Sequence, residues 1–168
     1  MARGSRPMVR RDGTNMRFRF EPMSQRQACA VAAWRYDPPY DFYDAVADPE
    51  DFAELLDPVQ RAGHYFAVLG APGSLVGFFM FKQEGSTVEV GLGLRPDLTG
   101  CGGGLSFLLA GLEFARGRYA PTQFRLAVTA FNQRAIRVYE RAGFRQVEPY
   151  MHRTNGGEHA FLRMERSA

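Results

Sequence analysis

The chain has 168 residues, 45% hydrophobic and 13% aromatic, which is enough apolar material for the core of one domain and excludes a wholly disordered chain. No run approaches the roughly 18 to 20 apolar residues that span a bilayer, and the N-terminus lacks the apolar stretch of a secretory signal, so we expect a cytoplasmic protein. The formal net charge of +3 is too modest to indicate a nucleic-acid or membrane partner.

The N-terminal part predicts a tail, a strand and helices. Residues 1–15 contain Arg, Gly, Ser and Pro without periodicity, so we expect a disordered basic tail before a single domain of residues 16–168. Met16 to Phe20 alternates apolar and charged residues as a half-buried strand does, and Pro22 ends it. Helical patterns follow at about 24–35, 41–47 and 50–57.

An antiparallel meander is predicted next, with strands at 64–69, 75–82 and 87–94. In the last strand, ideal pleating puts Leu92 and Leu94 on one face, and Glu89, Gly91 and Gly93 on the other. Glycines weaken a strand unless something approaches its backbone closely. A ligand lying over Gly91 and Gly93 beside Glu89 would explain them, and a bulge or tight bend without a ligand is the alternative.

The second half predicts a helix, a strand, a second helix and two final strands. After a glycine-rich stretch, five apolar residues recur at helical spacing and are expected to face the sheet, namely Leu105, Leu108, Leu109, Leu112 and Ala115. Phe124 to Val128 alternates as a strand, and Asn132 is a good N-cap for a helix that Gly143 closes. The final strands are expected at 143–149 and 158–165.

Glycines gather after the strand 87–94, in the run Thr99-Gly100-Cys101-Gly102-Gly103-Gly104. Such a loop, followed by a helix N-terminus, lets backbone N–H groups and the helix dipole meet an anion. No Gly-Lys-Ser/Thr closes it, and the spacing is not Gly-x-Gly-x-x-Gly after a parallel strand, so ATP and NAD are disfavoured. A flexible turn is the alternative. Cys29 and Cys101 lie in unrelated contexts, so no metal site or disulfide framework is expected.

A second motif follows in the helix that Asn132 caps: Asn132, Ala135, Tyr139, Gly143 and Phe144. With both motifs, the chain resembles the GNAT superfamily of acyl-CoA-dependent N-acetyltransferases over roughly residues 16–165. Members carry Val-x-Pro and then Arg/Gln-x-x-Gly-x-Gly/Ala at the coenzyme A diphosphate loop. Here Leu94-Arg95-Pro96 precedes the glycines, and Thr99 stands where arginine or glutamine is usual.

The resemblance implies an α/β (α+β) fold with a mixed, mostly antiparallel sheet of six to seven strands flanked by helices. It also implies acetyl-coenzyme A as cosubstrate and no metal, and it is compatible with a homodimer. The residues implied to bind the coenzyme are Leu92, Leu94, Thr99, Gly100, Cys101, Gly102, Gly103, Gly104, Asn132 and Tyr139.

Three groups are implied to do the chemistry of a direct transfer in a ternary complex. The backbone N–H of Leu94, at a bulge, polarises the thioester carbonyl, and Tyr139 protonates the departing thiolate. Glu89 is our candidate for the base that takes the amine proton. The alternatives are a Tyr139 that only packs in the core and a Glu89 that is solvent-facing or salt-bridged.

The acceptor is expected to meet the segment between the first two strands. Trp34, Tyr36, Tyr40 and Tyr43 lie there among aspartates, and aromatic faces with acids attract a cation. Packing of these rings onto the sheet is the alternative. We therefore expect N-acetylation of a small cationic primary amine. A peptide or protein amine as acceptor, and a coenzyme-binding module without turnover, are the competing readings.

Overall fold

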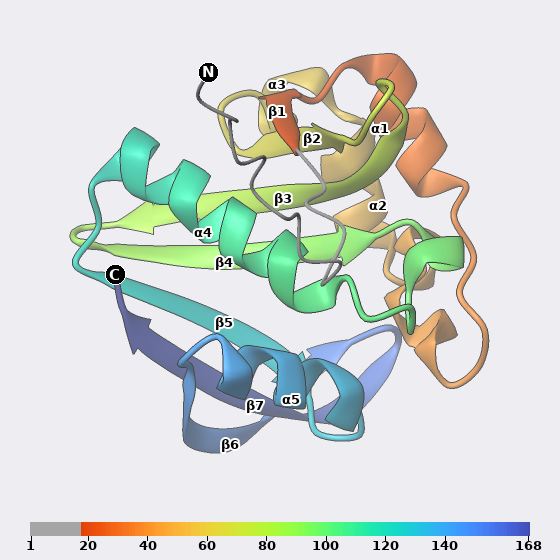
Figure 1. Ribbon diagram of the computed structural model, residues 1–168. Coiled ribbons are helices and arrows are strands. Elements are labelled where there is room, and N and C mark those ends of the chain that lie inside the picture. The colour runs from red at the N-terminus through yellow and green to blue at the C-terminus, as the bar shows by residue number, and fades with distance from the viewer. Residues whose placement is uncertain (1–17) are drawn as a thin grey trace, which may run out of the picture.

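The computed structural model describes residues 18–168, so the expected tail and the first residues of the strand predicted from Met16 lie outside the described residues. One seven-stranded sheet has the order β1-β2-β3-β4-β5-β7-β6 (Figure 1). Neighbouring strands pair antiparallel except β4 and β5, which are parallel. The predicted mixed, mostly antiparallel sheet is confirmed. Its strands are Arg19–Pro22 (β1), Tyr65–Leu69 (β2), Leu75–Glu84 (β3), Thr87–Leu94 (β4), Gln123–Thr129 (β5), Arg145–Thr154 (β6) and Gly157–Ser167 (β7).

Helices cover both faces of the sheet. Figure 1 shows α4 and α5 in front of it and α1 and α2 behind. The α-helices are Gln25–Ala32 (α1), Pro49–Leu56 (α2), Pro58–Arg61 (α3), Gly104–Tyr119 (α4) and Gln133–Arg141 (α5), and the 3₁₀ turns are Tyr40–Tyr43 (η1), Ala45–Ala47 (η2) and Pro96–Leu98 (η3). Among residues 18–168, no helix is long and apolar enough to cross a membrane.

Two predicted helices differ from those observed. The first ends at Ala32, three residues before Arg35, although Ser24 caps it through a capping box with Gln27 as its capping residues predict. The piece expected at 41–47 is a pair of 3₁₀ turns divided at Asp44, whose extended backbone interrupts the helix. The piece expected at 50–57 is α2, which Asp48 caps.

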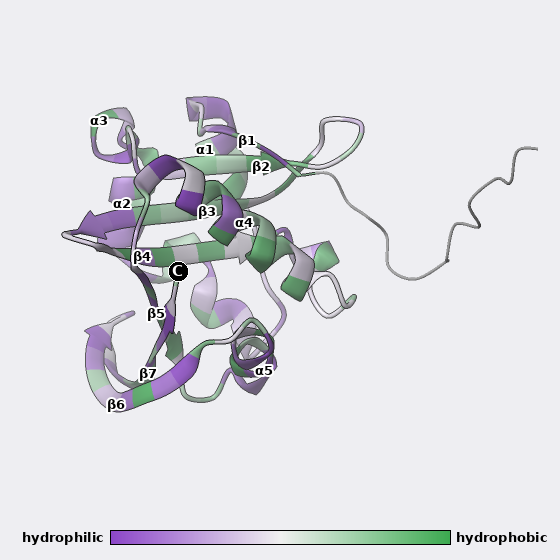
Figure 2. Ribbon diagram, turned by 60° about the vertical axis from the view of Figure 1, so that its left-hand side comes forward, coloured by the Kyte–Doolittle hydropathy of each residue, from purple (hydrophilic) through white to green (hydrophobic). Residues whose placement is uncertain are grey.

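The core lies between α4 and the strands β2 to β5. Figure 2 shows the apolar residues gathered on the inner strands, whereas β6 is largely hydrophilic, and most residues of β6 are exposed. Leu108, Leu112 and Ala115 are buried as expected, but Leu109 is 42% exposed and turns away from the sheet. Gly111 brings α4 close to β3, because a Cβ there would lie 2.1 Å from the Phe79 ring.

The glycines of β4 make room for side chains of the neighbouring strand. A Cβ on Gly93 would lie 2.4 Å from the ring of Phe78, its partner on β3, and one on Gly91 would lie 3.2 Å from Met80. β3 therefore supplies one close approach to these glycines, and both glycines also line the cavity described below. A bulge is not the explanation, because the ladder from β3 to β4 runs without a register shift as far as Leu94. The bulge expected at Leu94 is thus wrong.

The sheet opens between its two parallel strands. β4 and β5 pair only over Thr87–Glu89 and Gln123–Arg125, and Figure 1 shows them diverging beyond that point. β4 then continues beside β3, while β5 stays paired with β7 along its whole length. Residues from both faces of the sheet can therefore meet in this opening.

Candidate active site

A cavity of about 690 Å³ occupies this opening, a size typical of small-molecule sites. Its lining comes from both faces of the sheet, with the glycine loop, α4 and α5 on one side and η1, α2 and β3 on the other. The predicted site residues that line it are Leu92, Leu94, Thr99, Gly100, Gly102, Gly104, Asn132, Tyr139, Trp34, Tyr36, Tyr40 and Tyr43. Cys101, Gly103 and Glu89 are not part of the lining.

The glycine loop presents unpaired backbone N–H groups. Gly100 and Gly102 have φ of +72° and +83°, a left-handed conformation that favours glycine. No side chain caps α4 at Gly103, and the first N–H to bond at this end is that of Phe107, to the carbonyl of Gly103 at 3.1 Å. Within the described chain, the N–H groups of residues 100–106 donate to no protein acceptor. Such a row at a helix N-terminus fits a phosphate.

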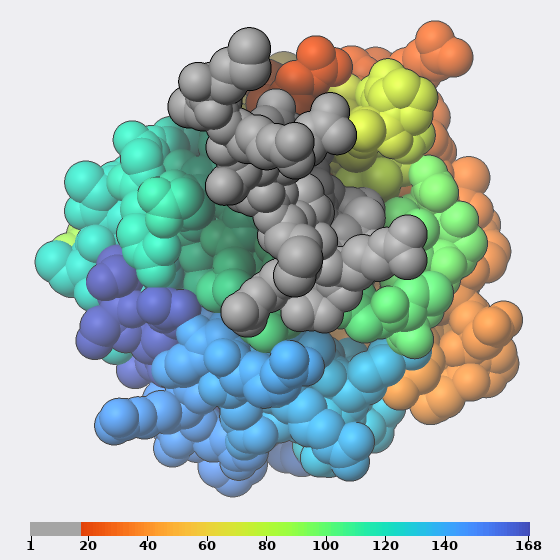
Figure 3. Space-filling view, viewed as in Figure 1, coloured from red at the N-terminus to blue at the C-terminus, as the bar shows by residue number. Residues whose placement is uncertain are grey.

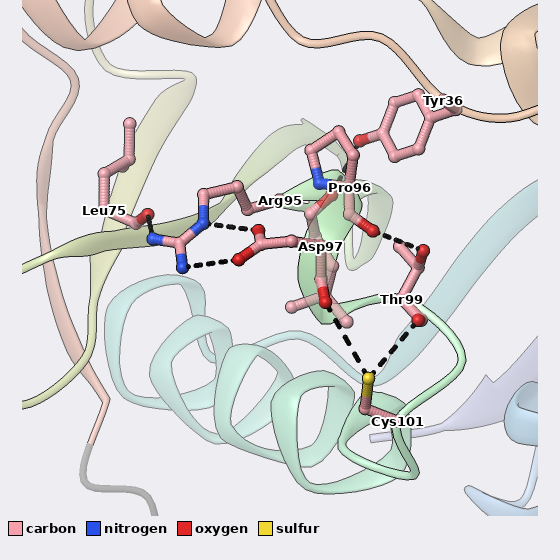
Figure 4. Close-up of polar contacts among 8 residues, drawn as sticks. Tyr36, Leu75, Arg95, Pro96, Asp97, Thr99 and Cys101 are labelled. Atoms are coloured by element: carbon pink, nitrogen blue, oxygen red, sulfur yellow. Dashed lines mark hydrogen bonds and ion pairs between the residues drawn. The ribbon is translucent and has the colours of Figure 1, made fainter.

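Side chains hold this loop from its outer side (Figure 4). Arg95 joins Asp97 at 2.6 Å and the carbonyl of Leu75 at 2.9 Å. The Thr99 hydroxyl donates to Pro96 O at 2.7 Å, and the Cys101 thiol points to the carbonyls of Asp97 and Thr99. The side chains of Thr99 and Cys101 are therefore used inside the loop, which leaves the backbone amides to meet a ligand.

Asn132 ties three elements together below the opening. Its Oδ1 accepts from the N–H of Ala135 at 3.1 Å and so caps α5, while its Nδ2 donates to the hydroxyl of Tyr43 at 3.2 Å. The same hydroxyl bonds the side chain of Thr129 at the end of β5. Tyr43, predicted as an acceptor contact, thus also fixes η1 to β5 and α5.

Tyr139 lies in the cavity lining with a hydroxyl that has no hydrogen-bond partner among residues 18–168. Burial raises the pKa of this phenol, and the nearby Tyr43 adds to the rise. The hydroxyl therefore stays protonated at neutral pH and is able to give a proton to a neighbouring anion.

Tyr36 reaches the end of β4. Its hydroxyl donates to the carbonyl of Leu94 at 2.7 Å, and its own N–H donates to Asp44 Oδ1 at 2.9 Å. Burial, and then the negative charge of Asp44, raises the pKa of Tyr36. This residue holds the segment before η1 against the strand end at which the sheet opens.

Carboxylates of α2 form an acidic side of the cavity that the sequence reasoning missed. Asp48 caps α2 and accepts from Thr154 Oγ1 at 2.6 Å, and these hydrogen bonds lower its pKa to about 2. Asp51 lines the cavity but remains exposed, so the loss of solvent around it is only partial. That partial desolvation raises its pKa, and Asp48 and Glu54 add to the rise. Glu54 lies 3.6 Å from Lys82 Nζ. The sequence does contain a signal for this acidic side, because Asp51 and Glu54 are three residues apart in a predicted helix and so share one helix face.

Comparison with known proteins identifies the chain's family. Residues 27–144 match the family model described as Acetyltransferase (GNAT) family. The chain belongs to this family. The prediction of an acetyl-CoA-dependent N-acetyltransferase is thereby confirmed, and no curated protein matches the chain.

Solved structures share the acetyltransferase fold at low sequence identity. A GNAT-family acetyltransferase from Bacillus anthracis has a TM-score of 0.71 and 18% identity, over 90% of this chain and 95% of that one. Spermidine N-acetyltransferase from Vibrio cholerae, in complex with CoA and spermine, has a TM-score of 0.72 and 15% identity, over 89% and 95%. A putative phosphinothricin N-acetyltransferase has a TM-score of 0.65 and 16% identity, over 90% and 98%.

Glu89 of this acetyltransferase lies at the closed end of the opening. Its carboxylate is 3.1 Å from Arg125, which also binds Glu84 at 2.8 Å. Glu89 and Arg125 form the last pair of the parallel ladder between β4 and β5. The structure does not bring Glu89 into the cavity, and the salt-bridged alternative for this residue is the one observed.

Proposed function

We propose that this acetyltransferase transfers the acetyl group of acetyl-coenzyme A to the primary amine of a small cationic molecule. The observation that carries the proposal is a cavity that passes through the sheet between β4 and β5, with free amides on one side and carboxylates on the other. An anionic coenzyme and a cationic acceptor could meet there from opposite faces.

The coenzyme side fits the parts of coenzyme A. The free N–H groups of residues 100–106 suit its phosphates, and the apolar lining from Leu92, Leu105 and Val138 suits its pantetheine arm. Bound there, the coenzyme supplies an acetyl group activated as a thioester. The backbone N–H of Leu94 remains our candidate for polarising the thioester carbonyl.

Three proton transfers accompany the reaction, in which a C–N bond forms and a C–S bond breaks. The ammonium nitrogen loses one proton before it attacks and a second after the C–N bond has formed, and the departing sulfur gains one. A primary amine is protonated at neutral pH, so a base has to take a proton before the nitrogen can attack. We assign this role to Asp51, acting through water, because it lines the cavity and its raised pKa favours accepting a proton. Tyr139 donates its phenolic proton to the departing sulfur. The second proton lost by the nitrogen restores the phenol through water, and the first passes from Asp51 to solvent.

The acceptor side favours a cation. The carboxylates of Asp44, Asp51 and Glu54 line this side of the cavity. Lys82 also lines it, and its charge is already paired with Glu54. Trp34 adds an aromatic face, which attracts an ammonium group by roughly 0.5 to 2 kcal/mol. The spermidine N-acetyltransferase with the same fold is consistent with an amine acceptor but is too distant in sequence to name it.

Thiol release tests the proposal against its alternatives. The purified protein is incubated with acetyl-coenzyme A and a panel of polyamines, aminoglycosides, amino acids and short peptides, and coenzyme binding is measured in the same sample by calorimetry. We expect release with a small polycation. Release with peptides alone would favour a protein amine, and binding without any release would favour a module without turnover.

A charge variant tests the acidic side with a matched control. Asp51→Asn is expected to raise the KM of the cationic acceptor and to lower kcat, with coenzyme affinity unchanged. Glu50→Gln removes a neighbouring charge that is exposed, as Asp51 is, but lies outside the lining, so it should leave both constants near the wild-type values. Equal effects of the two substitutions would contradict the role given to Asp51.

A further inference from the structure

Arg134 of α5 lies beside the glycine loop. One of its terminal nitrogens, Nη1, is 3.4 Å from the position that a Cβ on Gly100 would occupy. Figure 3 shows the surface of the loop region, in green, meeting that of the α5 region, in blue. The next turn of α5 contacts the loop as well, because Val138 lies 3.5 Å from the Cβ position of Gly104. Helix α5 therefore forms a second wall along the row of free amides.

The guanidinium of Arg134 is held from behind by an aromatic ring. Its Cζ lies 4.0 Å from the centre of the Tyr40 ring, a distance typical of cation–π stacking. This pair stands between the main cavity and a second cavity of about 550 Å³, since both residues line both cavities. One face of the guanidinium is thus covered, and its edge is left for a ligand.

No acid neutralises Arg134 within residues 18–168. Arg95, Arg116, Arg125 and Arg163 each have a carboxylate partner, but Arg134 has neither an ion pair nor a side-chain hydrogen bond in this part of the chain. The hydroxyl of Thr99, at the position where related loops carry arginine or glutamine, is committed to Pro96 O. The loop lacks a cationic side chain of its own, and α5 places one next to it.

We propose that Arg134 binds a phosphate group of the coenzyme and supplies the charge that the loop lacks at Thr99, with Tyr40 as the residue that positions the guanidinium. The inference rests on the proposed place of the coenzyme in this cavity. An arginine edge offers paired donors that match phosphate oxygens, and the free amides of residues 100–106 complete a concave anion site.

Calorimetric binding of coenzyme A, dephospho-coenzyme A and pantetheine tests this proposal without relying on turnover. For Arg134→Gln we expect about tenfold weaker coenzyme A binding and unchanged pantetheine binding. Arg137→Gln is the matched control, because Arg137 is exposed on the same helix and lines neither cavity. It should bind coenzyme A nearly as the wild type does.

The dephosphorylated ligand distinguishes the two phosphate sources. An equal loss with dephospho-coenzyme A supports a contact to the diphosphate, and a loss confined to coenzyme A supports a contact to the 3′-phosphate. Unchanged coenzyme A binding by Arg134→Gln, or an equal loss with pantetheine, would overturn the role of Arg134. Failure of the wild-type protein to bind any of the three ligands would overturn the proposed function as well.

Substitution of Tyr40 separates stacking from its hydroxyl. Tyr40→Phe keeps the aromatic face and should bind coenzyme A normally, whereas Tyr40→Leu should bind it about threefold more weakly. In the Arg134→Gln background, Tyr40→Leu should have no further effect on coenzyme A binding, because the cation is gone. Additive losses would show that Tyr40 does not act through Arg134.

Discussion

Replacing Tyr139 by phenylalanine removes one hydroxyl from the cavity and nothing else. The ring keeps its contact with Phe144, whose centroid is 6.2 Å away. The hydroxyl has no hydrogen-bond partner among residues 18–168, so no described donor or acceptor is left unpaired, and the free energy of unfolding should change by less than about 0.5 kcal/mol. Any large effect on turnover would therefore be chemical.

The expected loss follows from the role of a general acid. Such a group typically contributes at least about 100-fold, or about 2.7 kcal/mol of activation free energy. We expect kcat to fall by about that factor in a thiol-release assay, with coenzyme affinity unchanged by calorimetry. The loss should shrink with an aromatic thioester, because its thiolate is a weaker base and needs less help from an acid.

A distant tyrosine gives the control. Tyr119→Phe removes a hydroxyl that donates to Gly63 O at 3.4 Å, away from the cavity lining, and should leave kcat unchanged. If Tyr139→Phe also turned over at the wild-type rate, the acid role would be refuted. If it unfolded at a much lower temperature, the assumption that the hydroxyl is structurally idle would be wrong.

Three further predictions concern stability. Gly111→Ala should lower the free energy of unfolding by about 1 to 3 kcal/mol, because its Cβ would overlap the ring of Phe79. Gly117→Ala lies in the same helix but has open space around its Cβ, and should raise the free energy of unfolding by about 0.5 to 1 kcal/mol. Denaturant titration compares the two variants. Asp48→Ala should lower the free energy of unfolding by about 1 to 2 kcal/mol, because the N-cap of α2 is lost. The pKa of Asp48 is about 2 in the folded protein and near 4 in the unfolded chain. The stabilisation by its carboxylate is therefore fully present above pH 4 and should vanish in acid melts as the pH falls through 2. Burial raises the pKa of Tyr65 above its value near 10 in the unfolded chain, so the unfolded chain ionises first. Alkaline melts should show the free energy of unfolding falling above pH 10, by up to about 1.4 kcal/mol per pH unit. A flat profile in this range would contradict the burial of Tyr65.

Local pattern was enough to predict most elements of the fold. The strand 87–94 was predicted with its observed bounds, and Asn132 was identified as the cap of α5. These features depend on alternation, turn residues and caps, which act between neighbours in the chain. The ends of the elements were predicted less well. The strand predicted at 143–149 continues to Thr154, because pairing with β7 extends β6 beyond any local signal in the sequence.

The sequence by itself determined the kind of chemistry, because the glycine loop and the motif from Asn132 to Phe144 are short local runs that together resemble the GNAT superfamily. Only the tertiary structure decided which other residues join them. β4 and β5 stay paired as far as Glu89, which forms an ion pair with Arg125. Their separation beyond that pair opens the cavity to Asp51 and Arg134. Those placements depend on which strands lie side by side, and that is set by packing between segments far apart in the chain.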